Sequence, residues 1–455
     1  MSYKVKRVID VGRALKEGRA LAERERWPRE RLEAYQRERL AELVRHAVAH
    51  APYYRERLPR GRVEPADLPA LDKTTLMERF DDIVCDRRLR RNELLEHLDG
   101  LDRDALYLGE YRAMTTSGSS GRKGLFVYDR AGFVRCAAQF FRCNDMCGVK
   151  PSIPRLRMAV IGGGSPTHMT RRGAALLSVG LYRILSLPVT MPVPKLVEAL
   201  NAFQPAYMNA YPSVAALLAD EQLAGRLRIR PERMTTSSEL RTAEMTERIE
   251  SAFGVRPFDI YGTTEGLWGC SCEHGEGIHL FEDMALVENV DADGRPVPDG
   301  EPGARLLVTN LYNRAQPLIR IAVSDMVTID PEPCPCGRTL RRMRAIDGRA
   351  DDVLELGGVA VHPVQFGVVT ADRAVREFQV VQHGERLRLR VVLREHAAVA
   401  EATHRLRERV AERLTGLGVT GVTIQVETCD EIARPPGGKL QMIVADRRPE
   451  VLVRR

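Results

Sequence analysis

Apolar and polar residues alternate at helical spacings over roughly the first hundred positions of the chain. Between Arg26 and His50, the side chains of Leu32, Leu40 and Val44 recur along one helical face, with glutamate and arginine residues between them. Prolines interrupt this pattern shortly after position 50. The pattern predicts an N-terminal region of charged, amphipathic helices.

Short apolar runs alternate with helical stretches from residue 112 to about residue 258. Met158–Ile161 and Ala206–Met208 have the length and composition of buried strands. Ala131–Met146 and Pro194–Phe203 have helical periodicity. Strands that alternate with helices predict an α/β domain with a largely parallel sheet.

The pattern changes to mainly β structure near residue 303 and again after residue 350. We expect one helix, His396–Leu417, and a final strand at Val422–Val426. The fold class is therefore α/β, with a large N-terminal domain of mixed sheets and helices at residues 1–350 and a small, mobile α+β domain at residues 351–455. The other predicted strands are Ala304–Val308, Leu318–Ile321, Met326–Ile329, Phe378–Val381 and Leu387–Leu393.

Composition narrows the class of protein without identifying it. The 455 residues are 44% hydrophobic and 29% charged, as in a folded globular protein and unlike a disordered or fibrous one. No apolar run reaches the roughly 18 residues of a membrane span, since Arg183 interrupts the best candidate, Leu176–Val189. The net charge of +7 is small for this length. We therefore expect neither a membrane nor nucleic acid as a partner.

The N-terminus and the cysteine content predict a cytoplasmic protein. Met1–Asp10 lacks the apolar region of a signal peptide. Nine cysteines, an odd number without a secretion signal, indicate reduced thiols rather than a disulfide scaffold.

The most informative segment is Thr115–Gly124, in which hydroxyl residues and glycines run unbroken up to two cations, Arg122 and Lys123. Backbone N–H groups and hydroxyls of such a loop can surround phosphate oxygens, and glycine permits a close approach. The segment does not match the Walker A pattern. The alternative interpretation is a flexible surface linker.

A second segment, Asp259–Glu265, places an aromatic ring, a glycine, two threonines and a carboxylate at a short strand end. Tyr261 could stack on a base and Thr264 could donate to a phosphate. Glu265 could hold Mg²⁺, which prefers oxygen ligands. Taken alone, these residues could equally form an ordinary turn.

Two later segments, Asp347–Asp352 and Pro436–Lys439, become informative because of the order of all four segments along the chain. Together the four segments resemble the adenylate-forming superfamily of acyl-CoA synthetases, and in particular its phenylacetate–CoA ligase branch. The resemblance covers nearly the whole chain. Further fragments that carry it are His46–Leu58, Leu71–Phe80, Gly277–Asp283, Pro317–Ile321, Cys334–Arg338 and Gly348–Leu354.

The resemblance implies that ATP and Mg²⁺ activate a carboxylic acid as an acyl-adenylate, which then passes to the thiol of CoA. Thr264 would contact the α-phosphate, Glu265 the magnesium, and Lys439 would support adenylation. Asp325 would hold the ribose and Arg349 the ribose or a phosphate. Asp351 would be the hinge of the small domain. The adenine pocket would include Ser238, Glu239, Asp259 and Tyr261, and Gly262 and Thr263 would also contact the nucleotide. The phosphate loop would include Thr116, Ser117, Gly118, Ser119, Ser120, Gly121 and Lys123.

The chemistry agrees with these roles. Attack of a carboxylate on the α-phosphate brings two anions together, so Lys439 and Mg²⁺ would neutralise the developing charge. Rotation of a small domain would then replace the lysine by a thiol channel. The chain departs from the superfamily pattern at Arg122–Gly124, at Ala322–Asp325 and after Lys439, where the segment Leu440–Met442 lacks the usual arginine. These departures are compatible with an acceptor other than the CoA thiol.

The acyl group would lie beside Phe141, Tyr211, Pro212 and Gly262, where aromatic rings would suit an aryl or arylacetic acid. The alternative is that these rings only pack the core. The acceptor could also be an amine, a carrier-protein thiol or a small nucleophile such as nitrite. A binding protein without activity is a third hypothesis, which the joint presence of Glu265, Asp325, Arg349 and Lys439 disfavours. The resemblance also suggests a homodimer.

Two cysteine doublets predict a structural zinc site. Cys272, His279, Cys334 and Cys336 could give a tetrahedral Cys₃His site that joins two loops. His274 or Cys270 could replace one of these ligands, and unpaired buried thiols are the alternative. The other clustered cysteines, Cys136, Cys143 and Cys147, lie on a predicted helix and are expected in the core.

Overall fold

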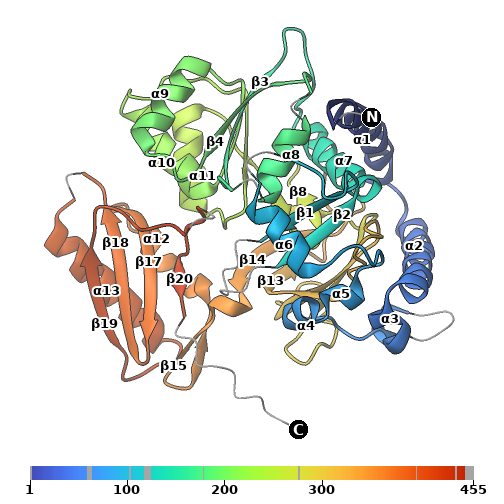
Figure 1. The fold of residues 1–455 in the computed structure, drawn as a ribbon. Helices are drawn as coiled ribbons and strands as arrows, with labels where there is room; N and C mark the ends of the chain where they lie inside the picture. Colours follow the sequence, from blue (N-terminus) through green and yellow to red (C-terminus); the bar gives the residue numbers. More distant parts are fainter. Residues whose placement is uncertain are drawn as a thin grey trace.

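The computed structural model describes residues 3–58, 64–101, 104–116, 124–165, 167–177, 179–274, 277–395, 397–435 and 438–445. The chain forms a large body of helices and sheets, beside which the C-terminal residues form a smaller unit (Figure 1). Among the described residues, no helix combines the length and the apolar character required to cross a lipid bilayer.

Helices build the N-terminal region, as the pattern of the first hundred residues predicts. They are α1 (Tyr3–Arg24), α2 (Arg29–His50), α3 (Pro52–Arg57), α4 (Lys73–Glu78), α5 (Phe80–Ile83) and α6 (Arg91–Asp99). Pro52, which interrupts the sequence pattern, occupies the first turn of α3, where its missing N–H group is not required. The hairpin of β1 (Tyr111–Thr115) and β2 (Leu125–Asp129) follows these helices.

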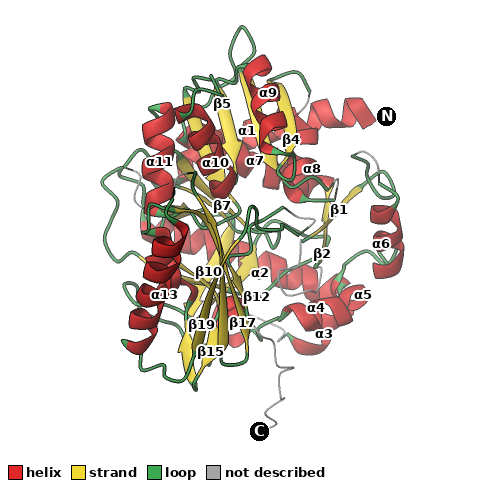
Figure 2. Ribbon diagram, turned by 90° about the vertical axis from the view of Figure 1, so that its left-hand side faces the viewer, coloured by secondary structure: helices red, strands yellow, loops and turns green. Residues whose placement is uncertain are grey.

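The large body contains a nine-stranded sheet in the order β13-β14-β9-β8-β7-β6-β5-β3-β4. Figure 2 shows its strands β4 and β5 beside the helices α9 and α10. Strands β3 to β7 pair in parallel, and helices connect them in sequence. The parallel strands are β3 (Arg157–Gly162), β4 (Arg183–Pro188), β5 (Tyr207–Ala210), β6 (Arg233–Ser237) and β7 (Phe258–Gly262), and the helices around them are α7 (Arg130–Met146), α8 (Met169–Leu177), α9 (Val193–Phe203), α10 (Pro212–Leu223) and α11 (Ala243–Phe253).

Both faces of the parallel part of the sheet are covered. On β3, Met158 and Val160 belong to the core that contains α1 and α7, whereas Ala159 and Ile161 belong to the core that contains α9 to α11. Successive side chains of a strand point to opposite faces, which is why both sets are apolar. In such a sheet the carboxyl ends of the strands are the usual place for a ligand.

Antiparallel strands extend the sheet and form a smaller one. β8 (Trp268–Cys270), β9 (Ile278–Leu280), β13 (Asp325–Ile329) and β14 (Arg342–Arg349) continue the central sheet. β10 (Ala285–Val290), β11 (Arg305–Asn310) and β12 (Ile321–Val323) form a separate three-stranded sheet. The predicted strand Leu318–Ile321 is largely wrong. The observed strand begins only at Ile321, because Arg320 has a left-handed φ of 49° that no continuous strand tolerates.

The C-terminal unit has a core of its own, composed of residues between Leu354 and Ile443. A four-stranded sheet in the order β19-β18-β17-β20 packs on helix α13, and a small hairpin of β15 and β16 precedes it. The prediction that Val422–Val426 is the final strand is wrong, since β20 follows it and pairs in parallel with β17. The elements are β15 (Leu354–Leu356), β16 (Val359–Val361), α12 (Gly367–Thr370), β17 (Val375–His383), β18 (Arg386–Leu393), α13 (Val399–Thr415), β19 (Thr423–Thr428) and β20 (Ile443–Val444).

Candidate active site

The carboxyl ends of the parallel strands carry most of the residues with candidate chemistry. Tyr211 and Pro212 follow β5, Ser238 and Glu239 follow β6, and residues 263–265 follow β7. Because these strands are neighbours in one sheet, the segments meet along one edge. The C-terminal segment 438–440 reaches the same edge, where the backbone N–H of Leu440 donates to Glu239 Oε1 at 2.6 Å.

The predicted phosphate loop falls between β1 and β2 in the sequence. Its central residues, Ser117, Gly118, Ser119, Ser120, Gly121 and Lys123, fall outside the described residues. Thr116 and Gly124, which flank them, are held together: the N–H of Gly124 donates to Thr116 Oγ1 at 2.9 Å, and the N–H of Thr116 donates to the Gly124 carbonyl at 3.0 Å. The hairpin thus fixes where the loop begins and ends.

The turn after β7 is anchored by buried side chains. The Tyr128 hydroxyl donates to the Thr264 carbonyl at 2.8 Å, the Asn310 amide to the Glu265 carbonyl at 2.9 Å, and the Tyr312 hydroxyl to the Gly266 carbonyl at 3.2 Å. Gly266 has a φ of 111°, and a Cβ there would lie 2.0 Å from Asn310 Nδ2. The turn therefore requires glycine and presents the Thr264 and Glu265 side chains from a fixed backbone.

Asp325, the predicted ribose ligand, joins two other predicted site residues. The Tyr261 hydroxyl donates to Asp325 Oδ2 at 2.6 Å, and Arg349 Nε donates to Asp325 Oδ1 at 3.1 Å. Burial and the Asp325 carboxylate raise the pKa of Tyr261 well above its usual value. Burial lowers the pKa of Arg349, but the Asp325 charge, together with other nearby acidic groups, outweighs this effect, so the pKa of Arg349 is also raised. The Asp325 carboxylate thus lies between a phenol and a guanidinium that both donate to it.

Lys439 is half-buried beside this group. Desolvation, together with the nearby Arg349 guanidinium, lowers the pKa of Lys439 to about 8. The charges of three carboxylates act in the opposite direction and raise this pKa: Asp325, Glu239 and Glu265. The structure therefore brings the lysine of the C-terminal segment together with predicted site residues that lie far from it in the sequence.

Other predicted nucleotide-binding residues have structural partners. Asp259 is near Arg241, with 3.6 Å between Oδ2 and Nε, and burial raises the pKa of its carboxyl. Ser238 has a left-handed φ of 74° directly after β6. Gly262 lies against the Trp268 ring. Thr263 closes the turn, since its N–H donates to the Leu267 carbonyl at 2.9 Å.

The predicted acyl-pocket residues separate into two groups. Tyr211 is buried at the carboxyl end of β5, where burial raises the pKa of its phenol to about 12, and Pro212 opens α10. Phe141 lies instead where α7 packs against α1, and a Cβ placed on Gly18 would be 3.2 Å from its Cβ. Asp351, the predicted hinge, is exposed in a short 3₁₀ turn, Ala350–Asp352, between the large body and β15.

Three residues beside the site were not predicted from the sequence. Lys73 of α4 lies 4.0 Å from Glu265 Oε1, Arg434 contacts the strand-end edge, and His168 lies near Lys439, with a pKa lowered to about 4 by burial and by that lysine. Only Lys73 gave a signal, because it lies within the fragment Leu71–Phe80 that carries the resemblance.

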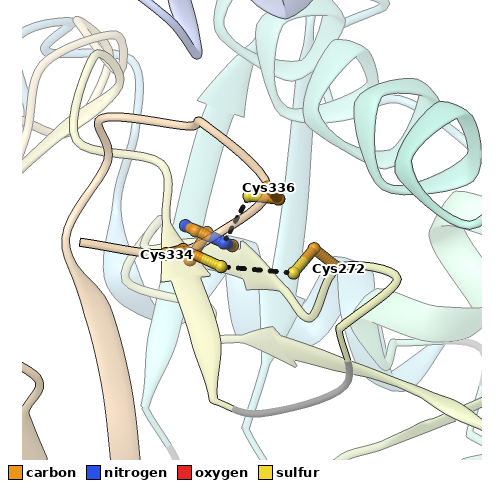
Figure 3. A group of neighbouring side chains, drawn as sticks. Cys272, Cys334 and Cys336 are labelled. Carbon is orange, nitrogen blue, oxygen red and sulfur yellow. Dashed lines mark hydrogen bonds between the residues drawn. The ribbon is translucent and has the colours of Figure 1, made fainter. Parts of the chain in front are cut away.

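The four predicted metal ligands converge, and their three cysteines belong to the core that contains α1 and α7. The ligand atoms of Cys272, His279, Cys334 and Cys336 lie within 4.8 Å of one another, and all four residues are buried. Figure 3 shows the three cysteine side chains gathered in one place. The Sγ atoms of Cys272 and Cys334 are 3.6 Å apart, and Cys336 Sγ is 3.4 Å from His279 Nε2. His279 Nδ1 lies 3.2 Å from the Leu340 carbonyl, which orients the ring. This donor set suits a closed tetrahedral site.

The two alternative ligands lie elsewhere. His274 is exposed, and Cys270 Sγ is 3.6 Å from Cys147 Sγ in the core. Cys136, Cys143 and Cys147 are buried, as predicted.

Comparison with known proteins agrees with the fold and the site. No family model matches the chain. The solved structures that resemble it include 2-hydroxyisobutyryl-CoA ligase, which is 26% identical. In the postadenylation state with 2-HIB-AMP, the comparison covers 93% of this chain and 91% of that chain with a TM-score of 0.73. In the thioesterification state with 2-HIB-AMP and CoA, the TM-score is 0.58 at the same coverage.

The structural neighbours are thus acyl-CoA ligases of the adenylate-forming superfamily, which confirms the class that the sequence predicted. Within it, the curated relatives are phenylacetate-coenzyme A ligases. That of Thermus thermophilus is 29% identical over 472 residues, which cover 94% of this chain and 99% of the relative. That of Escherichia coli is 27% identical over 438 residues, which cover 89% of this chain and 93% of the relative.

Proposed function

We propose that this protein activates a carboxylic acid with ATP as an acyl-adenylate and transfers the acyl group to the thiol of CoA. The observation that carries the proposal is the docking of the Lys439 segment on the carboxyl edge of a parallel sheet, where the backbone N–H of Leu440 donates to Glu239 Oε1 at 2.6 Å. The charges of Asp325, Arg349 and Glu265 also act on the Lys439 ammonium there. The names of the relatives, phenylacetate-coenzyme A ligases, support an aryl or arylacetic acid as the substrate.

In the first half-reaction, a carboxylate oxygen of the acid attacks the α-phosphorus of ATP. The bond from this phosphorus to the bridging oxygen breaks, and pyrophosphate leaves with the electron pair. The Lys439 ammonium would neutralise charge on the phosphate oxygens, and Thr264 would donate to the α-phosphate. Asp325, oriented by Tyr261 and Arg349, would hold the ribose hydroxyls. Glu265 would hold Mg²⁺, whose contribution is further neutralisation of the phosphates.

In the second half-reaction, the CoA sulfur attacks the acyl carbon, the bond to the AMP oxygen breaks, and AMP leaves. We assign residues 351–455 to a unit that moves about Asp351 between the two steps. The higher TM-score with the postadenylation state of 2-hydroxyisobutyryl-CoA ligase, 0.73 against 0.58, supports an adenylation-type arrangement in this structure. Asp351 is exposed in a short turn between the two units, and this position is compatible with a hinge.

The test is pyrophosphate exchange with the purified chain across a panel of aryl and arylacetic acids, followed by chromatographic detection of the acyl-CoA. We expect acid-dependent exchange and, with CoA, stoichiometric formation of AMP and thioester. AMP release without a thioester would contradict CoA as the acceptor and direct attention to an amine, a carrier-protein thiol or nitrite. No exchange with any acid would contradict adenylation itself.

We further propose that Cys272, His279, Cys334 and Cys336 bind one structural Zn²⁺. The four donors are the types and number that a closed zinc site uses. The site would also stabilise the junction of α1 and α2, because Arg26 donates to the Cys336 carbonyl at 2.9 Å and Thr339 to the Trp27 carbonyl at 2.6 Å.

Metal analysis of the native protein tests the zinc site. We expect about one zinc per chain, since structural sites are nearly fully occupied. Cys334→Ser should lose the metal and unfold at a lower temperature. Cys429→Ser, in which a partly buried thiol outside the cluster is changed, is the matched control. Retention of zinc by Cys334→Ser, or a metal-free native protein, would contradict the proposal.

A further inference from the structure

Arg434 lies five residues before Lys439 and connects the lysine segment to both units. Its Nη1 donates to Ser213 Oγ of the large body at 3.0 Å and to the Gly438 carbonyl at 3.4 Å. Its Nη2 donates to Glu377 Oε1 on β17 at 2.5 Å. One guanidinium therefore contacts the large body, the C-terminal sheet and the backbone directly before Lys439.

Glu239 contacts the same segment from the other side. Its carboxylate accepts from the backbone N–H of Leu440 at 2.6 Å and from the backbone N–H of Ser213 at 3.2 Å. Arg434 Nη1 is 3.6 Å from the same carboxylate. Since Ser213 lies in the first turn of α10, the helix N-terminus also stabilises this negative charge. The residues on both sides of Lys439 are thus bound to groups of this one cluster.

The cluster is largely desolvated. The side chains of Glu239 and Glu377 are 7% exposed and that of Arg434 is 13% exposed. Two buried carboxylates that face one guanidinium are stable only while that cation is in place, because an unpaired buried charge is costly. Undocking of the segment would separate Glu239 from Arg434.

Gly438 adds a packing contact to the charged contacts that hold the lysine segment, residues 438–440, on the large body. We call these contacts together the seat of the lysine segment. It has a φ of 73°, and a Cβ at this position would lie 1.9 Å from Val189 Cγ1, in the residue that follows β4. The segment therefore packs closely on the large body as well as being bound by charge.

We propose that Arg434 is a positioning residue for the first half-reaction: by joining Glu239, Glu377 and Ser213, it seats the segment that places Lys439 in the site. The inference rests on the proposed function, because adenylation is the step that uses Lys439. The second half-reaction requires the C-terminal unit to rotate, so the contacts of Arg434 with Ser213 and Glu239 must then break. Arg434 should consequently affect adenylation and not thioester formation.

The test measures the two half-reactions separately in Arg434→Ala and Arg434→Lys. For Arg434→Ala we expect the rate of adenylation, measured by pyrophosphate exchange, to fall about 100-fold. This is the loss typical of a misplaced catalytic group. Thioester formation from a supplied acyl-adenylate and CoA should change less than about threefold, since the seat is not used in that step. Arg434→Lys keeps the positive charge but lacks the planar guanidinium, so its adenylation rate should be about tenfold higher than that of Arg434→Ala.

Two further variants control for folding and for charge. Arg388→Ala removes an exposed cation of the same unit, 3.8 Å from Glu427, and should leave both half-reactions within about twofold of the original chain. Gly438→Ala disturbs the seat sterically without changing any charge, and it should repeat the selective loss of adenylation. Thermal unfolding establishes that each variant is folded.

Hydrogen exchange gives a readout that does not depend on activity. The backbone N–H of Leu440 donates to Glu239 Oε1 at 2.6 Å, so its exchange reports whether the segment that carries Lys439 is in place. In Arg434→Ala, exchange of peptides that contain Leu440 should become about tenfold faster, because the segment leaves its seat, whereas Arg388→Ala should leave it unchanged. Unchanged exchange in Arg434→Ala, or an equal loss of both half-reactions in a folded variant, would overturn the inference. If the original chain adenylates no acid, the proposed function fails, while the exchange of Leu440 still decides whether Arg434 seats the segment.

Discussion

Two parts of the site hold their catalytic groups in different ways. The turn after β7, which carries Thr264 and Glu265, is bound through its backbone carbonyls by Tyr128 and Asn310, both fully buried. The segment that carries Lys439 is bound mainly through charged side chains that reach across from one unit to the other. The first arrangement cannot change without unfolding part of the core, whereas the second can separate and form again.

The difference matches the proposed chemistry. Phosphate and magnesium contacts are needed as long as the nucleotide is bound, so their residues belong on rigid elements. The lysine is needed only until the adenylate forms. A desolvated but ionic contact can hold it in place and still release it when water regains access to the charges.

Replacement of Lys439 should have the largest effect and should be confined to one step. In Lys439→Ala we expect adenylation to fall about 10²- to 10³-fold, the usual cost of removing one preorganised group that stabilises developing charge. Thioester formation from a supplied adenylate should remain within about threefold, because the lysine has left the site in that step. Rapid-quench measurement of each half-reaction decides this. Equal loss of both steps would mean that the segment does not move.

Replacement of Asn310 should damage both steps and the fold. Its side chain is fully buried, donates to the Glu265 carbonyl, and accepts from the N–H groups of Tyr312 and Asn313 at 3.1 and 3.0 Å. We expect Asn310→Ala to lower the free energy of unfolding by about 2–3 kcal/mol, since several buried groups lose their partners. Both half-reactions should slow together, because the whole turn shifts.

The control for Asn310 is Asn201→Ala. Asn201 makes comparable hydrogen bonds, to the Arg226 carbonyl at 2.9 Å and from the Arg228 N–H at 2.7 Å, but on the surface. It should cost less than about 1 kcal/mol in urea unfolding. Similar losses in the two variants would contradict the view that burial makes the turn rigid.

The comparison also explains how much could be predicted from the sequence. The alternation of strands and helices follows from local periodicity, and the turn after β7 is a contiguous segment whose residues carry their own chemistry. The partners of Lys439 are not local: Glu239 and Lys439 are joined only because the end of β6 meets the C-terminal segment. Arg434 and His168 gave no signal for the same reason, and Phe141 was assigned to the acyl pocket although it packs against α1.

The pH dependence of adenylation should report the environment of Lys439. Desolvation lowers its pKa to about 8 from an ordinary value of 10.5, so the ammonium is present below pH 8 and is lost as the pH rises through that value. We expect kcat/KM for ATP to fall about tenfold per unit well above pH 8, since this parameter follows ionisation in the free enzyme. In Lys439→Arg the decline should disappear, although the rate is lower. A decline that persists in that variant would belong to another group.

The smallest expected effect concerns ion pairs that join the C-terminal unit to the large body away from Lys439. Arg394 of the C-terminal unit lies 2.7 Å from Asp220 and 3.6 Å from Glu244, and these side chains are 21–30% exposed. Because exposed pairs contribute about 0–1 kcal/mol, Arg394→Ala should slow adenylation no more than about fivefold, and less at high salt. Arg226→Ala, which breaks an ion pair with Glu221 inside the large body, should leave the rate unchanged. If Arg394→Ala instead matched Lys439→Ala, docking would depend on the whole interface rather than on the groups beside the lysine.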